Sequence, residues 1–133
     1  MAIRQKRSKY HSRKITRDGM TFDSIKEYRR FCELTLLEKA GSITDLKRQV
    51  EFELIPSQFE EIPTGEFYKR GERKGMPKMK LVCVEQSVKY VADFTDTENG
   101  KMVVEDTKGF KTKDYILKRK MMLYLKGIKI QET

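Results

Sequence analysis

The sequence predicts a single α/β domain in which a small mixed sheet is flanked by helices. Two segments, at about 24–40 and 113–126, place apolar residues at helical spacing between cap signals. Between them lie a segment with apolar residues at every second position and an Asn-Gly pair that joins two further strands. The length of 133 residues fits one domain with a real core.

The N-terminal region predicts an arm, a turn and then the first helix. Residues 1–14 are basic and lack a core-forming pattern, so we expect a flexible basic arm before a domain that spans 15–133. Asp18-Gly19 is a turn signal between two short extended pieces. A capping box at Ser24–Glu27 begins the helix, and Gly41 follows its end.

The next segments predict a half-buried strand and a long excursion. Apolar side chains fall on even positions from Leu46 to Leu54, and Pro56 ends this strand. Residues 57–79 carry the remaining prolines with several glycines and lysines, which predicts a long, mobile excursion from the domain.

A hairpin and a second helix complete the predicted order. Residues 81–94 read as strand, with a break near Gln86-Ser87, and Asn99-Gly100 joins them to a strand at 102–108. Thr112 can cap the second helix, Gly127 ends it, and Ile128–Ile130 can add a short strand. Tyr115, Tyr124 and the Met121-Met122 pair are expected in the core.

Composition argues against a membrane-spanning, secreted or zinc-binding protein. The longest apolar run is MMLYL, far short of a membrane span, and the basic N-terminus lacks the apolar segment of a secretory signal. Cys32 and Cys83 have no metal-site spacing, and the chain has one histidine. We expect two reduced, buried thiols and a cytoplasmic protein, with no membrane partner.

The net charge of +9 is concentrated near the two ends of the chain. Residues 1–17 hold seven bases and no acid, and residues 108–129 hold eight bases and one acid, Asp114. Such excesses suit a polyanionic partner, most simply DNA, although a solvated tail and helix face would have the same composition. The candidate nucleic-acid contacts are Arg7, Lys9, Arg13, Lys14, Lys111, Lys113, Lys118 and Lys120.

The stretch VVEDTKGF contains the best candidate for chemistry. An acid, any residue and a lysine occur together three times, but only Asp106-Thr107-Lys108 has a second acid placed by local geometry. The hairpin brings Asp93 onto the neighbouring strand, and Asp106 and Lys108 share a face because they are two residues apart. Two carboxylates and the Thr107 carbonyl could hold one Mg²⁺, and Lys108 could act on a bound water.

Asp93 and Asp106-x-Lys108, within the order helix, three strands, helix, strand, resemble the PD-(D/E)XK nuclease superfamily, with its restriction-endonuclease-like core. The run from FDSIKEYRRF to LKRKMMLYLKGI is also similar to a family of small phage-encoded nuclease-like proteins. The resemblance implies a Mg²⁺-dependent endonuclease, with Mn²⁺ as a substitute, metal ligands Asp93 and Asp106, and Lys108 as catalytic lysine. Ala92 stands where the superfamily's name has proline.

Two further residues have open interpretations. Glu27 is either a third acidic ligand, as a first-helix glutamate is in several members of the superfamily, or only part of the capping box. Gln49 could touch the site, but an ordinary polar position on a strand is the simpler interpretation.

The sequence thus predicts a metal-dependent DNA endonuclease that selects branched or duplex structures in phage recombination or replication, similar to a Holliday-junction resolvase. A size of 133 residues leaves little room for a separate sequence-reading domain. The alternatives are a catalytically silent nucleic-acid-binding protein with the same fold, and an RNA-directed protein. A homodimer is compatible with paired cuts on two strands.

Overall fold

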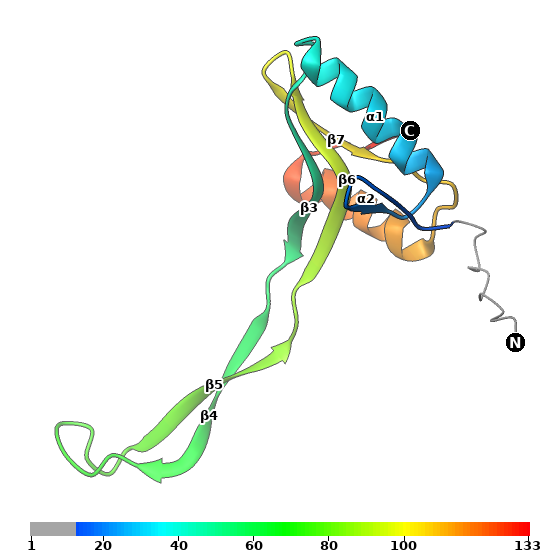
Figure 1. Cartoon of the computed structure of the whole chain (residues 1–133). Coiled ribbons are helices and arrows are strands. Elements are labelled where there is room, and N and C mark those ends of the chain that lie inside the picture. Colours follow the sequence, from blue (N-terminus) through cyan, green and yellow to red (C-terminus); the bar gives the residue numbers. More distant parts are fainter. Residues whose placement is uncertain (1–12) are drawn as a thin grey trace, which may run out of the picture. The chain divides into compact units, whose positions relative to one another are not determined.

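The computed structural model describes residues 13–133, which contain two helices and eight strands (Figure 1). In chain order they are β1 (Ile15–Arg17), β2 (Met20–Phe22), α1 (Ile25–Lys39), β3 (Thr44–Ile55), β4 (Gln58–Phe67), β5 (Pro77–Glu85), β6 (Val88–Glu98), β7 (Lys101–Asp106), α2 (Lys113–Lys126) and β8 (Gln131–Glu132). The chain is therefore mixed α/β, as the sequence predicts. Neither described helix has the length and apolar character needed to span a membrane.

The chain divides into two compact units. One contains the residues up to Phe52 together with Tyr90–Thr133, and the other is Glu53–Lys89. The first unit contains both helices and the parts of β6 and β7 that carry the candidate site. The second contains the two-stranded ribbon β4–β5.

The main sheet has four strands in the order β3-β6-β7-β8. Strands β6 and β7 are antiparallel, with Phe94 opposite Glu105, and the Asn99-Gly100 turn joins them with both residues at positive φ (50° and 75°). Strand β8 is parallel to β7, with Glu105 opposite Gln131. The hairpin that the sequence predicts is therefore confirmed.

Helix α1 packs on one face of the sheet. Leu34, Ile43 and Phe94 form a buried cluster, and Phe31 lies against it with its ring 6.3 Å from that of Phe94. On the same face, Arg30 reaches Glu105 of β7. The α1 side of the sheet is thus apolar with one buried ion pair.

Helix α2 packs on the opposite face. Thr112 caps it by accepting a hydrogen bond from the backbone N–H of Tyr115, and Gly127 ends it at φ 66°. Tyr115 is buried, with its ring 6.4 Å from that of Tyr90 in β6. Because Asp106 follows Glu105, it points toward this face rather than toward α1.

Residues 57–79 form regular structure that the sequence analysis missed. Strands β4 and β5 pair antiparallel, with Ile62 opposite Lys80, and a register shift lies between Pro63 and Phe67. In a ribbon of two strands each strand is an edge, so Pro63 and Pro77 remove no essential ladder bond. The prolines argued for a loop, but two edges accommodate them.

Two smaller predictions are wrong, those for the last strand and for the burial of Tyr124. The last strand is Gln131–Glu132 rather than 128–130, because the residues after Gly127 still close the helix, with the Ile128 N–H donating to the Met122 carbonyl. Tyr124 is 89% exposed because α2 buries mainly Tyr115 and Met122.

Both cysteines are exposed rather than buried. Cys32 lies on α1 away from the buried position Leu34, and Cys83 lies on the ribbon, where its thiol donates to the Glu85 carbonyl at 3.3 Å. A two-stranded ribbon has too little depth to enclose a side chain by itself.

Candidate active site

The middle of β6 and the end of β7 bring Asp93 and Asp106 together. Phe94 is opposite Glu105, so the next step of this antiparallel register sets Asp93 beside Asp106. The Asp93 carboxylate accepts hydrogen bonds at one oxygen, Oδ2, from the Thr107 backbone N–H (2.9 Å) and hydroxyl (3.0 Å). These two donors fix the orientation of a half-buried carboxylate.

Asp106 is fully buried and shares its surroundings with charged and polar groups. Its Oδ2 accepts from the Tyr90 hydroxyl at 2.6 Å, and its Oδ1 lies 3.2 Å from Lys108 Nζ. Oδ1 accepts no hydrogen bond of good geometry. Burial and the hydrogen-bonded, negatively charged Asp93 raise the pKa of Asp106 to about 7, although Tyr90 and Lys108 act in the opposite direction.

Lys108 is held between an acid and an aromatic ring. Its ammonium lies 4.7 Å from the centre of the Tyr115 ring in α2, in addition to its contact with Asp106. The side chain keeps 30% of its exposure, so it can meet a ligand from solvent. Its backbone carbonyl accepts from Lys26 Nζ at 3.5 Å.

Glu27 lies behind this group, at the start of α1, and both of its carboxylate oxygens accept hydrogen bonds. Oε2 accepts from the Asp23 backbone N–H (2.9 Å), and Oε1 accepts from the Gln49 side-chain amide (3.2 Å). Ser24 accepts from the Glu27 N–H, so the cap is formed, with Asp23 rather than Ser24 as the backbone donor. Burial, and next the charge of Asp93, raise the pKa of Glu27.

Gln49 belongs to this group although the sequence favoured an ordinary strand position. Its backbone has φ 51° inside β3, a left-handed conformation that is uncommon for a residue with a side chain. At this irregular position the Gln49 side chain donates a hydrogen bond to Glu27, a contact that the alternation of side chains along a regular strand does not predict. Strained residues of this kind cluster at functional sites.

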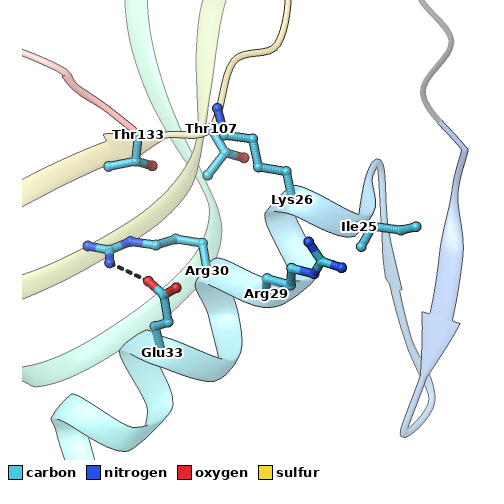
Figure 2. A pocket seen from close by; sticks show the side chains of 7 residues that line it. All are labelled: Ile25, Lys26, Arg29, Arg30, Glu33, Thr107 and Thr133. Carbon is cyan, nitrogen blue, oxygen red and sulfur yellow. Dashed lines mark hydrogen bonds and ion pairs between the residues drawn. The ribbon is translucent and has the colours of Figure 1, made fainter.

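A pocket opens over these residues. It has a volume of about 240 Å³ and is lined by Asp23, Ser24, Lys26, Glu27, Asp93, Thr107, Lys108, Gly109 and Phe110. A second pocket, of about 510 Å³, shares Lys26 and Thr107 with the first (Figure 2). There the Arg30 guanidinium is paired with Glu33, while the neighbouring Arg29 side chain points away from this ion pair.

The oxygen donors suit a hard divalent cation such as Mg²⁺. Asp93 and Asp106 supply two adjacent carboxylates, the unbonded Oδ1 of Asp106 has free acceptor capacity, and the Thr107 carbonyl follows directly in the chain. Within residues 13–133, no three His, Cys, Asp or Glu side chains converge closely enough to form a complete set of ligands. Two carboxylates remain sufficient because Mg²⁺ retains several waters. The residues therefore fit a Mg²⁺ ion that keeps several water ligands.

The predicted nucleic-acid contacts divide into paired and unpaired bases. Lys111 is 2.6 Å from Glu132, and Lys118 is 3.4 Å from Asp114. Lys113 and Lys120 are exposed on α2. Arg13 and Lys14 are also exposed, whereas Arg7 and Lys9 lie outside the described residues.

Tyr90 is a site residue that sequence reasoning missed. It lies three residues before Asp93, and regular alternation would place residues at that spacing on opposite faces of the strand. Both nevertheless contact Asp106. The alternation of residues along the strand gave no signal for the contact between Tyr90 and Asp106.

A family model described as "Protein of unknown function (DUF1064)" matches residues 7–131. No curated protein and no solved structure matches the chain. The match covers both helices, the ribbon and every candidate site residue.

Proposed function

The chain belongs to the DUF1064 family, described as proteins of unknown function, and from its own site we propose that it is a metal-dependent DNA endonuclease of the PD-(D/E)XK type. The observation that carries the proposal is the grouping of Asp93 on β6, Asp106 at the end of the antiparallel strand β7, and Lys108 just after it. The element order α1, β3, β6, β7, α2, β8 further supports it, since it repeats the helix-strand-strand-strand-helix-strand order of that superfamily's core.

Asp93, Asp106 and the Thr107 carbonyl would hold Mg²⁺, or Mn²⁺ in its place. The ion would lower the pKa of water and stabilise negative charge on the attacked phosphate. Tyr90 and Thr107 orient the two carboxylates by donating to them. Lys108, held over Tyr115, presents its ammonium beside Asp106, where it can hydrogen-bond to the attacking water or to a phosphate oxygen.

Within this class we favour structure-selective cleavage of branched or duplex DNA, as by a Holliday-junction resolvase in the cytoplasm of a phage-infected bacterium. The first unit offers a small pocket and basic side chains, which can read phosphates and shape but provide few contacts to base edges. A homodimer would supply two such sites for paired cuts.

A cleavage assay with matched variants tests the proposal. Plasmid, linear duplex, four-way-junction DNA and RNA are each incubated with Mg²⁺, Mn²⁺ or EDTA. Asp93→Asn and Lys108→Met should each lower cleavage at least roughly 100-fold, because each removes a group at the reacting phosphate. EDTA should abolish cleavage by the parent protein.

The chain contains its own control in a second acid-x-lysine sequence. Asp45 and Lys47 lie 3.5 Å apart on β3, are exposed, and have the same residue types and spacing as Asp106 and Lys108. Asp45→Asn suits the positive φ of 55° at this position, and it should cut as the parent does. If Asp93→Asn and Lys108→Met also cut normally, the active-site assignment is wrong. Tight DNA binding without cleavage under any condition would instead support the catalytically silent alternative.

A further inference from the structure

The ribbon β4–β5 has its acids mainly on one strand, and its bases on the turn and the start of the other strand. Strand β4 has three acids, Glu60, Glu61 and Glu66, and no base. The end of the ribbon, residues 68–80, which we call the basic tip, has six bases and one acid, Glu72. The six bases are Lys69, Arg70, Arg73, Lys74, Lys78 and Lys80.

The basic tip has defined structure. The Tyr68 N–H donates to the Met76 carbonyl at 3.0 Å, and the Gly75 N–H donates back to the Tyr68 carbonyl at 2.9 Å. Arg73 and Lys78 lie 5.8 Å and 5.6 Å from the centre of the Tyr68 ring. The bases are therefore presented on a closed, hydrogen-bonded turn, which lowers the entropy lost when they bind a partner.

The charge of the basic tip is not neutralised within the chain. Among the described residues, none of the six bases forms an ion pair with a carboxylate, whereas Lys111, Lys118 and Arg119 near α2 each do. All six bases except the half-buried Lys78 are exposed. A compact net charge of +5, from six bases and one acid, attracts a polyanion.

We propose that the basic tip is a second DNA-binding site that inserts into the major groove of a duplex. That groove is about 12 Å wide in B-DNA and admits a two-stranded β-ribbon. Lys69, Arg70 and Lys74 then contact phosphates along its edges. Glu60 and Glu61 of β4 pair farther along β5 than the turn does, so they lie outside the groove. The inference stands on the ribbon alone and does not require that the first site cuts DNA.

The test is the salt dependence of binding by the full chain in EDTA, where cleavage plays no part. The variant Lys69→Gln, Arg70→Gln, Lys74→Gln leaves Arg73 and Lys78 against Tyr68, so the turn should keep its fold. Fluorescence anisotropy with a short duplex DNA at several salt concentrations gives Kd and its slope. Three lost phosphate contacts should make the slope of log K against log salt shallower by about 2.7.

A variant with the same change in charge serves as the control. Lys39→Gln, Lys101→Gln, Lys129→Gln removes three exposed bases from other elements and should change the slope by less than one unit. Circular dichroism must show that both variants stay folded. A duplex RNA of the same sequence should bind more weakly than DNA, since its major groove is too narrow for side chains to read.

Three results would overturn the proposal: no duplex binding by the parent, an unchanged slope in the tip variant, or equal effects in the tip variant and the control. Light scattering adds a direct check on a protein partner. If the tip variant loses a homodimer while DNA binding stays as in the parent, the tip is a contact between copies of the chain. Loss of cleavage in Asp93→Asn with intact binding bears only on the first site, so the two proposals can fail separately.

Discussion

Asp106 combines complete burial with an acidic neighbour, and this has a measurable consequence. Its pKa of about 7 lies above the ordinary value near 4, so the folded protein binds a proton here more tightly than the unfolded chain does. Stability from this group is fully present below about pH 4 and is lost as the pH rises through about 7. At pH 8 the cation-free protein must hold the ionised Asp106 beside the Asp93 carboxylate.

Asp106→Asn should therefore stabilise the cation-free protein at pH 8 and have little effect at pH 5. Asparagine has nearly the same shape, can accept from Tyr90, and carries no charge near Asp93. We expect the Tm to rise by a few degrees at pH 8, measured by thermal melting in EDTA. Mg²⁺ should stabilise the parent but not the variant. Asp45→Asn is the control, and an equal rise there would show that the effect is not specific to the buried carboxyl.

Glu27→Gln tests whether the first helix contributes to metal binding. The amide oxygen can still accept from the Asp23 N–H, and Gln49 can rotate its amide to match, so the Tm should change little. The lost negative charge near Asp93 should weaken the apparent affinity for Mg²⁺ about 10-fold, since groups that support metal ligands have effects of this size. Titrating Mg²⁺ in the cleavage assay measures it. An unchanged Mg²⁺ dependence would show that Glu27 serves only in the N-terminal cap of α1.

The sequence indicated those site residues whose positions follow from regular geometry. Asp93 and Asp106 come together because a two-residue Asn-Gly turn fixes the strand register. The strand ends at Asp106, before the predicted end at Lys108, but the Lys108 ammonium still lies 3.2 Å from Asp106. Tyr90 and Gln49 could not be assigned in this way. Gln49 reaches Glu27 from a backbone at positive φ, and the Tyr90 hydroxyl contacts the buried Asp106; both contacts depend on tertiary packing.

At the scale of elements, one buried ion pair connects α1 to β7. Arg30 donates to both carboxylate oxygens of Glu105, at 2.7 Å and 2.8 Å, and the Glu105 side chain is 1% exposed. Asp96 lies close enough to Glu105 that burial and this second acid raise its pKa. Without Arg30, a buried carboxylate would face another acid with no opposing charge from this helix.

Arg30→Met should therefore destabilise the fold by about 3–5 kcal/mol, the usual cost of removing one partner from a buried ion pair. Denaturant unfolding measures the change in free energy. Arg29→Met, one position along α1 and exposed, should stay within about 0.5 kcal/mol of the parent. The double variant Arg30→Met, Glu105→Met should recover most of the loss. If the double variant does not recover stability, the loss comes from the packing of the Arg30 side chain and not from the unpaired Glu105 carboxylate.

The elements with local signals were predictable, whereas those that depend on distant partners were not. Ser24 and Gly41 bracket α1, and Thr112 and Gly127 bracket α2, through contacts within a few residues. Residues 57–79 combine prolines, glycines and charges, and only the pairing of β4 with β5 makes them strands. Sequence periodicity cannot supply a pairing partner 20 residues away when both faces of the ribbon are largely exposed.

Across the whole molecule, the net charge of +9 is less available than the composition suggests. Near α2, Lys111 and Arg119 pair with Glu132, and Lys118 pairs with Asp114. The basic helix face expected from the sequence is therefore partly neutralised by acids of the same chain. Among the described residues, the basic tip holds a compact net charge of +5, and further exposed bases lie on other elements, such as Lys113 and Lys120 on α2.

Deleting residues 1–14 should consequently weaken DNA binding while barely changing stability. The deletion removes six bases and no acid, which lowers the net charge from +9 to +3. If about half of these bases contact phosphate, the slope of log K against log salt should become shallower by about 2–3. Anisotropy titrations in EDTA measure the slope, and thermal melting checks stability. Cleavage at low salt and saturating protein should persist, because Asp93, Asp106 and Lys108 lie elsewhere.

A full-length chain with the same six bases changed to Gln separates charge from chain length. The deletion removes backbone and charge together, whereas the Gln variant removes charge alone, so equal slopes in the two proteins would assign the effect to phosphate contacts. The bases are Arg4, Lys6, Arg7, Lys9, Arg13 and Lys14, of which only the last two lie among the described residues. An unchanged slope in both proteins would mean that this segment serves a partner protein or a dimer contact instead, and the basic tip would then carry the principal electrostatic contact with DNA.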